Sequence, residues 1–273
     1  MSYIPLIARV DSLPPLPESV IKLEELFLEE SPDIDKLVGI IELDPSLTTD
    51  ILSKVNAPFY GFSKRIISVL QAVTLFGSTQ IRAIVLASSI QRCFDIDLSP
   101  YGITTSEFSK ISTMQSELMF QWYMGIDVDI ARAVTPIAFL METGKILIAK
   151  DIIENDKTDE FLADLSNYED INYVENMHTM MTSAQIDALV FKHLNLNDSF
   201  HECMRYVDNE YDTPENIKSM VQALQVIRTA INVQEQLSKY SIAETTKLLK
   251  DFSYDEDVFL RAVKRIKNKY DID

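Results

Sequence analysis

The chain has 273 residues, of which 47% are hydrophobic and 25% are charged, and its formal net charge is −17. A chain of this length and hydrophobicity can bury a sizeable core, which excludes an intrinsically disordered tail. The strong negative charge would repel phosphate backbones, so we expect no nucleic-acid partner.

The sequence also lacks membrane and disulfide signals. No stretch approaches the roughly 20 apolar residues that span a bilayer, and the first ten residues carry no basic segment of a secretory signal. Cys93 and Cys203 are too few for a disulfide framework and are expected to be buried, reduced thiols. These features predict a cytoplasmic chain with no membrane insertion.

Closely spaced helix signals fill the first 95 residues. Apolar residues at helical spacing predict five short helices, over residues 17–27, 32–41, 45–55, 68–76 and 78–90. Asp44 and Pro45 form a cap-then-proline start for the third helix. Asn56 is expected to satisfy backbone groups in the turn that runs to Gly61. Gly77 is expected to end the fourth helix in a left-handed conformation.

Helical patterns also dominate the rest of the chain, after a connector at residues 95–105. They predict helices over residues 106–124, 127–151, 158–167, 183–194, 198–207 and 213–237. Pro136 and Gly144 disturb the second of these helices. The last is amphipathic, and another part of the molecule must cover its apolar stripe. Ser241 and Ser253 each begin a capping-box pattern, which predicts further helix starts.

We therefore predict an all-α protein in three parts. These are an N-terminal helical lobe (1–105), a second helical lobe (106–212) and a helical C-terminal extension packed on the second lobe (213–273). The extension ends in a basic run that favours the C-terminal end of its own helix, or binds an acidic partner. The run consists of Arg261, Lys264, Arg265, Lys267 and Lys269.

The segment 139–145 reads FLMETGK and resembles the "LLHDIGK" segment of HD-type metal phosphohydrolases. Where those enzymes place adjacent His and Asp ligands, this chain has Met141 and Glu142. A thioether is a soft, weak donor and cannot replace an imidazole on a hard divalent metal. The motif therefore predicts a retained scaffold without the catalytic metal site.

Four further segments, in order, resemble the HDOD family, the HD-related output domains of bacterial signalling proteins. They are LPPLP at 13–17, IELDPSL at 41–47, the stretch 51–61 with Asn56, and the stretch 69–85 with Gly77 and Arg82. The resemblance covers roughly residues 13–208. It implies a two-lobe helical fold and a module that relays or scaffolds signals through contacts, with no established chemistry of its own and no cofactor.

The family often keeps traces of the enzymes' histidines in its second lobe, and this chain departs from that pattern. No histidine precedes His178. Ser183 lies near a position where the family commonly has a histidine, and Asp208 lies roughly where paired histidines occur. Glu142, Lys145, Ser183 and Asp208 are thus candidates to line a cleft left by the metal site. Asp44, Pro45, Asn56, Gly77 and Arg82 are family positions with an expected structural role.

Three functional hypotheses follow. The first is a non-catalytic regulatory module that acts on a protein partner. The second is a divergent metal-dependent phosphohydrolase built on His178, His193 and His201, although no H-x-x-E-H or H-E-x-x-H spacing supports it. The third is a sensor that holds a small, nucleotide-like effector in the cleft. A purely structural role is the alternative to the third hypothesis. In that case Gly144 relieves crowding at a helix kink, and Lys145 pairs with a neighbouring carboxylate.

Arg82 is expected to be a buried arginine that ties the lobes together. A buried guanidinium without a partner is costly, so the sequence predicts an ion pair with a carboxylate such as that of Asp44. The first hypothesis, a signalling module without catalysis, agrees best with both the missing ligands and the family resemblance.

Overall fold

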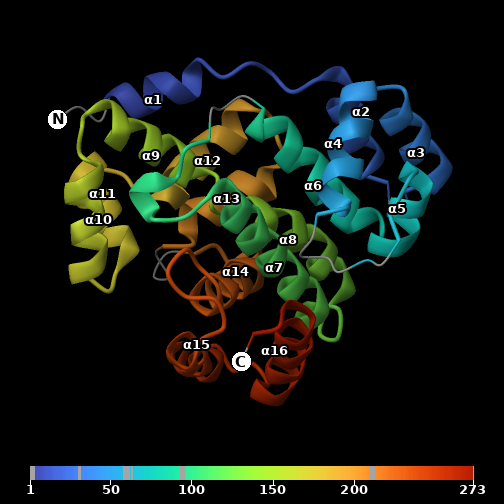
Figure 1. Ribbon diagram of the computed structural model, residues 1–273. Helices are drawn as coiled ribbons and strands as arrows, with labels where there is room; N and C mark the ends of the chain where they lie inside the picture. Colours follow the sequence, from blue (N-terminus) through green and yellow to red (C-terminus); the bar gives the residue numbers. More distant parts are fainter. Residues whose placement is uncertain are drawn as a thin grey trace.

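The computed structural model of the chain describes residues 4–29, 32–57, 62, 64–92, 96–208 and 213–272. Within these residues the fold is all-α, as predicted, and the β pairing is one isolated bridge between Ile231 and Gln236 (Figure 1). Cys93 and the end of the predicted turn at Gly61 lie outside the described residues. Cys203 is buried, and its thiol is free.

The N-terminal part contains the five predicted helices and one more. The helices are α1 (Ile4–Asp11), α2 (Glu18–Leu26), α3 (Ile34–Glu42), α4 (Pro45–Val55), α5 (Val69–Phe76) and α6 (Ser78–Gln91). Asp44 caps α4 as predicted, because its Oδ1 accepts from the Leu47 N–H at 3.0 Å and Pro45 follows. Helix α1, which the sequence did not predict, packs against α9 and α12 and lies apart from α2 to α5 (Figure 1).

Asn56 and Gly77 both shape chain reversals. The Asn56 amide donates to the carbonyls of Leu52 and Ile66 and accepts from the Ile66 N–H at 2.8 Å, so it satisfies backbone groups as expected. Gly77 joins α5 to α6 with φ 79° and ψ 157°. Its φ is positive, but the ψ value means that it does not adopt the left-handed helical conformation that we predicted.

The middle of the chain forms η2 (Ser99–Tyr101), α7 (Thr105–Tyr123), α8 (Val128–Leu140), α9 (Gly144–Glu154), α10 (Thr158–Asn167), α11 (Ile171–Thr179), α12 (Ser183–His193) and α13 (Asp198–Tyr206). Helix α8 packs against both α6 and α7 and so joins the first part of the chain to the second. The predicted single helix over 127–151 is wrong. The chain leaves the helix after Leu140, and α9 begins at Gly144, whereas Pro136 stays inside α8.

The C-terminal extension forms α14 (Lys218–Ala230), α15 (Lys239–Asp251) and α16 (Glu256–Tyr270). Helix α14 packs on α7 and α8, and α16 packs on α7. The predicted helix over 213–237 is shorter at both ends. After its C-terminal end, the Asn232 side chain accepts from two following N–H groups and turns the chain. The predicted capping boxes are also wrong: Ser238 caps α15 and Asp255 caps α16.

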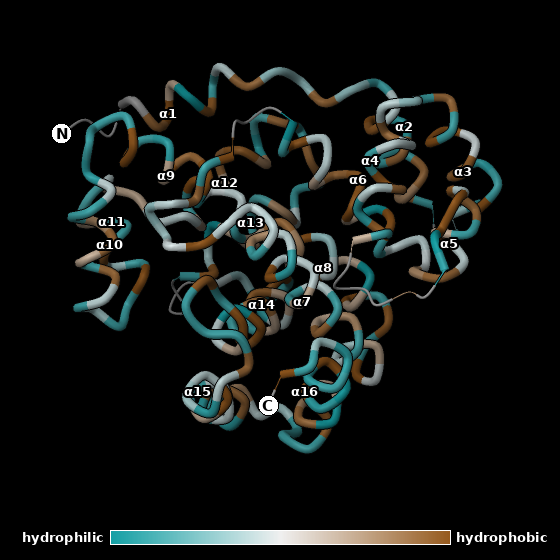
Figure 2. Tube along the Cα trace, in the orientation of Figure 1, coloured by the Kyte–Doolittle hydropathy of each residue, from teal (hydrophilic) through white to brown (hydrophobic). Residues whose placement is uncertain are grey.

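Hydrophobic residues follow the central helices α6 and α8, whereas α16 shows hydrophilic residues along its outer side (Figure 2). The basic residues Arg261, Lys264 and Arg265 are exposed there, and the opposite side of α16 is buried. No single helix in the described part of the chain is long and apolar enough to cross a membrane. By length and composition alone, α5 and α6 pass that test together, with a 119° bend between them.

Arg82 forms a partly buried ion pair, but its partner is Glu24, so the expected pairing with Asp44 is wrong. Its Nε lies 2.9 Å from Glu24 Oε1, and its Nη2 lies 2.7 Å from Glu24 Oε2. The guanidinium also stacks on Phe27 and on Phe200, with distances of 5.1 and 5.5 Å to the ring centroids. Because Phe200 belongs to α13, this arginine connects α2 and α6 to the second part of the chain.

Candidate functional site

The FLMETGK segment forms the junction between α8 and α9. Met141, which stands where HD enzymes have a histidine, is fully buried in the hydrophobic core. Glu142 is also fully buried, and it points toward other polar groups: the Gln115 amide donates to its Oε1 at 3.0 Å. The junction therefore delivers one carboxylate, and no imidazole, into the interior.

Lys145, the second residue of α9, is the first of two cations in this interior. Its Nζ lies 2.6 Å from Glu175 Oε1, 3.2 Å from Glu142 Oε2 and 3.0 Å from the Ser183 hydroxyl oxygen. Tyr101 donates to the same Glu175 oxygen at 3.0 Å. Lys145, Glu142 and Glu175 are each at most 1% exposed, so the ammonium is held entirely by protein groups.

Arg228 on α14 is the second cation. Its Nη1 donates to Asp208 Oδ1 at 2.6 Å, and its Nη2 donates to the Ser183 hydroxyl at 3.0 Å. Its Nε lies 3.8 Å from Glu142 Oε1. Thr182 donates to the other Asp208 oxygen at 2.5 Å, which fixes that carboxylate at the edge of the group.

Asp187 on α12 completes the group, which we call the polar cluster: Glu142, Lys145, Glu175, Ser183, Asp187, Asp208 and Arg228. The Asp187 Oδ1 accepts from the Gly144 N–H at 2.7 Å, at the start of α9. Gly144 itself lies against α12, because a Cβ built on it would be 2.2 Å from the Ser183 carbonyl oxygen. The close approach of α9 to α12 thus requires a glycine, as the crowding hypothesis expected.

The charges in the cluster shift one another's proton affinities. Burial and the negative charge of Glu142 raise the pKa of Asp187 well above its usual range. Burial opposes ionisation of Lys145 and Asp208 too, but there the opposite charges win. The carboxylates of Glu142 and Glu175 raise the pKa of Lys145, and the Arg228 guanidinium and the Thr182 hydroxyl lower the pKa of Asp208. The surroundings therefore favour the charged forms of Lys145 and Asp208 and disfavour the charged form of Asp187.

An open cleft of about 1370 Å³ leads from the surface to this cluster. Its walls are the α10–α11 connection, α14, and α15 with the turn before it. Glu142, Lys145, Asp208 and Arg228 lie among its lining residues. Farther from the polar cluster, the cleft lining is acidic. Lys247 is the one basic side chain among the described residues of this outer part. The outer carboxylates are those of Glu169, Asp170, Glu235, Glu244 and Asp251.

The structure thus brings together all four predicted cleft residues, Glu142, Lys145, Ser183 and Asp208, but Ser183 is fully buried and does not line the cleft. It does not bring together the three histidines of the metal-hydrolase hypothesis. His193 Nε2 lies 2.9 Å from the Leu13 carbonyl oxygen, and His201 Nε2 lies 3.2 Å from Asp198 on its own helix.

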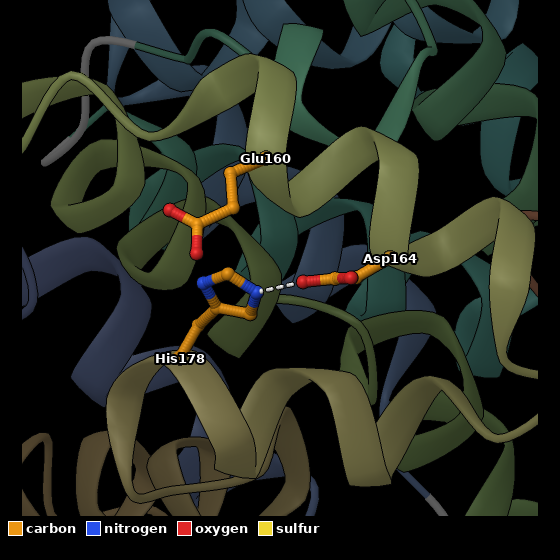
Figure 3. A group of neighbouring side chains, drawn as sticks. All are labelled: Glu160, Asp164 and His178. Carbon is orange, nitrogen blue, oxygen red and sulfur yellow. Dashed lines mark hydrogen bonds and ion pairs between the residues drawn. The ribbon is translucent and has the colours of Figure 1, made fainter.

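His178 has a different neighbourhood, formed by the α10 carboxylates Asp164 and Glu160 (Figure 3). Sequence reasoning missed Glu175, Asp187 and Arg228 of the polar cluster. Their signal was weak: each is one charged residue within a helix, and nothing local tells which distant charge it meets.

The sequence also matches a known protein family. The family model described as the HDOD domain matches residues 13–210. The chain therefore belongs to the HDOD family. The match ends before Arg228, so the second cation of the polar cluster comes from the extension that the family model does not include.

Individual relatives are distant. Among solved structures, a virulence factor from Campylobacter jejuni subsp. jejuni is 28% identical, with a TM-score of 0.60 over 98% of this chain and 95% of that one. A Marinobacter aquaeolei VT8 protein named for signal transduction is 20% identical, with a TM-score of 0.67 over 95% of this chain, but this chain spans only 58% of that one.

Among curated proteins, an uncharacterized protein of Treponema pallidum (strain Nichols) is 32% identical over 71 residues. These are 25% of this chain and 14% of that protein. The chain thus spans only a small part of that relative. Together the comparisons show the HDOD family over residues 13–210 and the same overall fold in distant relatives.

Proposed function

We propose that the chain is a non-catalytic signalling module that acts by binding a protein partner. The observation that supports this most directly is the state of the polar cluster. Lys145 and Arg228 already neutralise its carboxylates at 2.6 Å contacts with Glu175 and Asp208. A hydrolytic metal needs several converging ligands and an open position for water, and here two built-in cations occupy the carboxylates instead.

The cleft outside the cluster favours one kind of partner. Among the described residues, its outer lining carries five carboxylates and one lysine, and that lysine pairs with Glu244. Such a surface attracts basic side chains and repels a phosphate-bearing effector. We therefore expect a basic segment of a partner protein in the cleft and disfavour the nucleotide-like effector.

Charge reversal tests this proposal. The variant E244K/D251K should capture at least tenfold less of the partner than the wild-type chain does, in cross-linking and affinity purification from the native host. The control D35K changes an exposed carboxylate on α3, away from the cleft, and should capture the wild-type amount. Equal capture by both variants would contradict the assignment to the cleft.

A separate assay tests the absence of catalysis. The purified chain, supplied with Mn²⁺ or Mg²⁺, should not hydrolyse a generic phosphodiester above background. Hydrolysis that disappears in E142Q, with the fold intact by circular dichroism, would overturn the proposal. Bound metal alone would not, since an ion can bind elsewhere on the chain.

A further inference from the structure

His178 on α11 is buried beside two carboxylates of α10. The residue is 8% exposed, and its ring stacks edge-on against Phe161, 5.2 Å away. Its Nε2 lies 2.7 Å from Asp164 Oδ2. Its Nδ1 is closed off from solvent and has no hydrogen-bond partner, and Figure 3 shows this nitrogen facing the Glu160 carboxylate. A buried ring nitrogen in this state lacks the partner that such groups normally have.

Glu160 and Asp164 are four residues apart on α10, so both carboxylates lie on the helix face that meets α11. One donor atom from each of the three side chains lies within 4.8 Å of the others. Glu160 is exposed and Asp164 is partly exposed, so the carboxylates face solvent while the imidazole beside them is buried. These side chains are separate from the polar cluster, and His178 is the one member of the three-histidine set expected from the sequence that lies here.

We propose that this group is a zinc-binding site. His178 Nδ1 and the Glu160 carboxylate are the ligands, water completes the coordination shell, and Asp164 positions the imidazole by accepting the Nε2 proton. An imidazole that binds zinc through one nitrogen usually donates from the other to a carboxylate, and this is the arrangement of His178 and Asp164. A nitrogen and oxygen donor set suits zinc better than calcium or magnesium, which prefer oxygen ligands alone.

A neighbouring lysine competes with the ion. The Lys157 ammonium lies 3.9 Å from Glu160 Oε2, and the lysine side chain is 21% exposed. Zinc must displace this cation from the carboxylate, so removal of the lysine charge should strengthen zinc binding. The site would also join α10 to α11, and the connection between these helices forms one wall of the acidic cleft.

Zinc alone is the probe, titrated into the metal-free full-length chain and followed by calorimetry. We expect one ion per wild-type chain and at least tenfold weaker binding by E160Q. D164N should bind 10- to 100-fold more weakly, as expected for loss of an outer-sphere partner. K157Q should bind more tightly. The control H201A, which alters the exposed His201–Asp198 pair, should bind as the wild type does.

Zinc should also slow hydrogen exchange along α10 and α11 in the wild-type chain and not in E160Q. Because Glu160 is exposed, E160Q should fold normally. This variant therefore tests the zinc site even if the substitution H178A, at the buried ring, prevents folding. Absence of stoichiometric zinc in the wild type, or equal binding by E160Q, would overturn the proposal. Neither result bears on the proposed binding of a protein partner, which the double variant E244K/D251K tests separately.

Discussion

Arg228 is the residue that links the C-terminal extension to the polar cluster. It contacts Asp208 at 2.6 Å and Ser183 at 3.0 Å, and its side chain is 12% exposed. Removal of the Arg228 guanidinium leaves the carboxylates of Glu142 and Asp208 with less positive charge beside them. The cluster therefore needs its arginine for stability, whatever the cleft binds.

The substitution R228M should reduce the free energy of unfolding by about 3–5 kcal/mol, the usual cost of removing one partner from a buried ion pair. Urea unfolding checks this. R205M, at an exposed arginine of α13, should stay within about 0.5 kcal/mol of the wild type. A change in R228M as small as that in R205M would show that solvent, and not Arg228, compensates the carboxylates.

Asp187 should make stability depend on pH. Burial and the Glu142 charge raise its pKa, so the folded state keeps a proton that the unfolded state has lost. The resulting contribution to the free energy of unfolding is fully present below the ordinary aspartate pKa of about 3.9 and is lost as pH rises toward the raised pKa. The free energy of unfolding should fall by at most about 1.4 kcal/mol per pH unit. D187N cannot ionise, so it should lack this slope. Urea unfolding of both chains from about pH 5 to pH 8 checks this, and parallel curves would contradict it.

At the scale of elements, the contact between α9 and α12 depends on Gly144. G144A should be destabilised by about 1–3 kcal/mol or more, because the new Cβ would be 2.2 Å from the Ser183 carbonyl oxygen and the two helices must separate. G39A is the matched control. Gly39 lies within α3 and has no atom within 4 Å of a built Cβ, so alanine there should stabilise by about 0.5–1 kcal/mol. Thermal unfolding of both variants checks the opposite signs.

At the scale of the whole molecule, Arg82 couples the N-terminal helices to α13. A double-mutant cycle of R82M and F200L should give a coupling energy of about 0.5–2 kcal/mol, since the guanidinium lies 5.5 Å from the Phe200 ring in a largely buried position. The same kind of cycle on the more exposed pair Arg92–Asp50 should give a coupling energy of less than about 1 kcal/mol. Additive effects of R82M and F200L would mean that the two parts are joined through other contacts.

Local physical chemistry explains how much the sequence alone could predict. Apolar spacing and caps such as Asp44 act within a few residues, so helices α2 to α6 were predictable. The failures have two kinds of cause. The helix predicted over 127–151 breaks where α9 packs against the distant helix α12. The capping pattern at Ser253 fails for a local reason, because Asp255 provides the cap instead.

The sequence by itself determined the all-α class, the HDOD resemblance and the replacement of the motif's histidine by Met141, because these depend on residue types and short spacings. It also selected Glu142, Lys145, Ser183 and Asp208. Only the tertiary structure decided their partners. The polar cluster joins α9, α11, α12 and α14, and the His178 group joins α10 to α11. Such pairings depend on how whole helices pack, which no local pattern encodes.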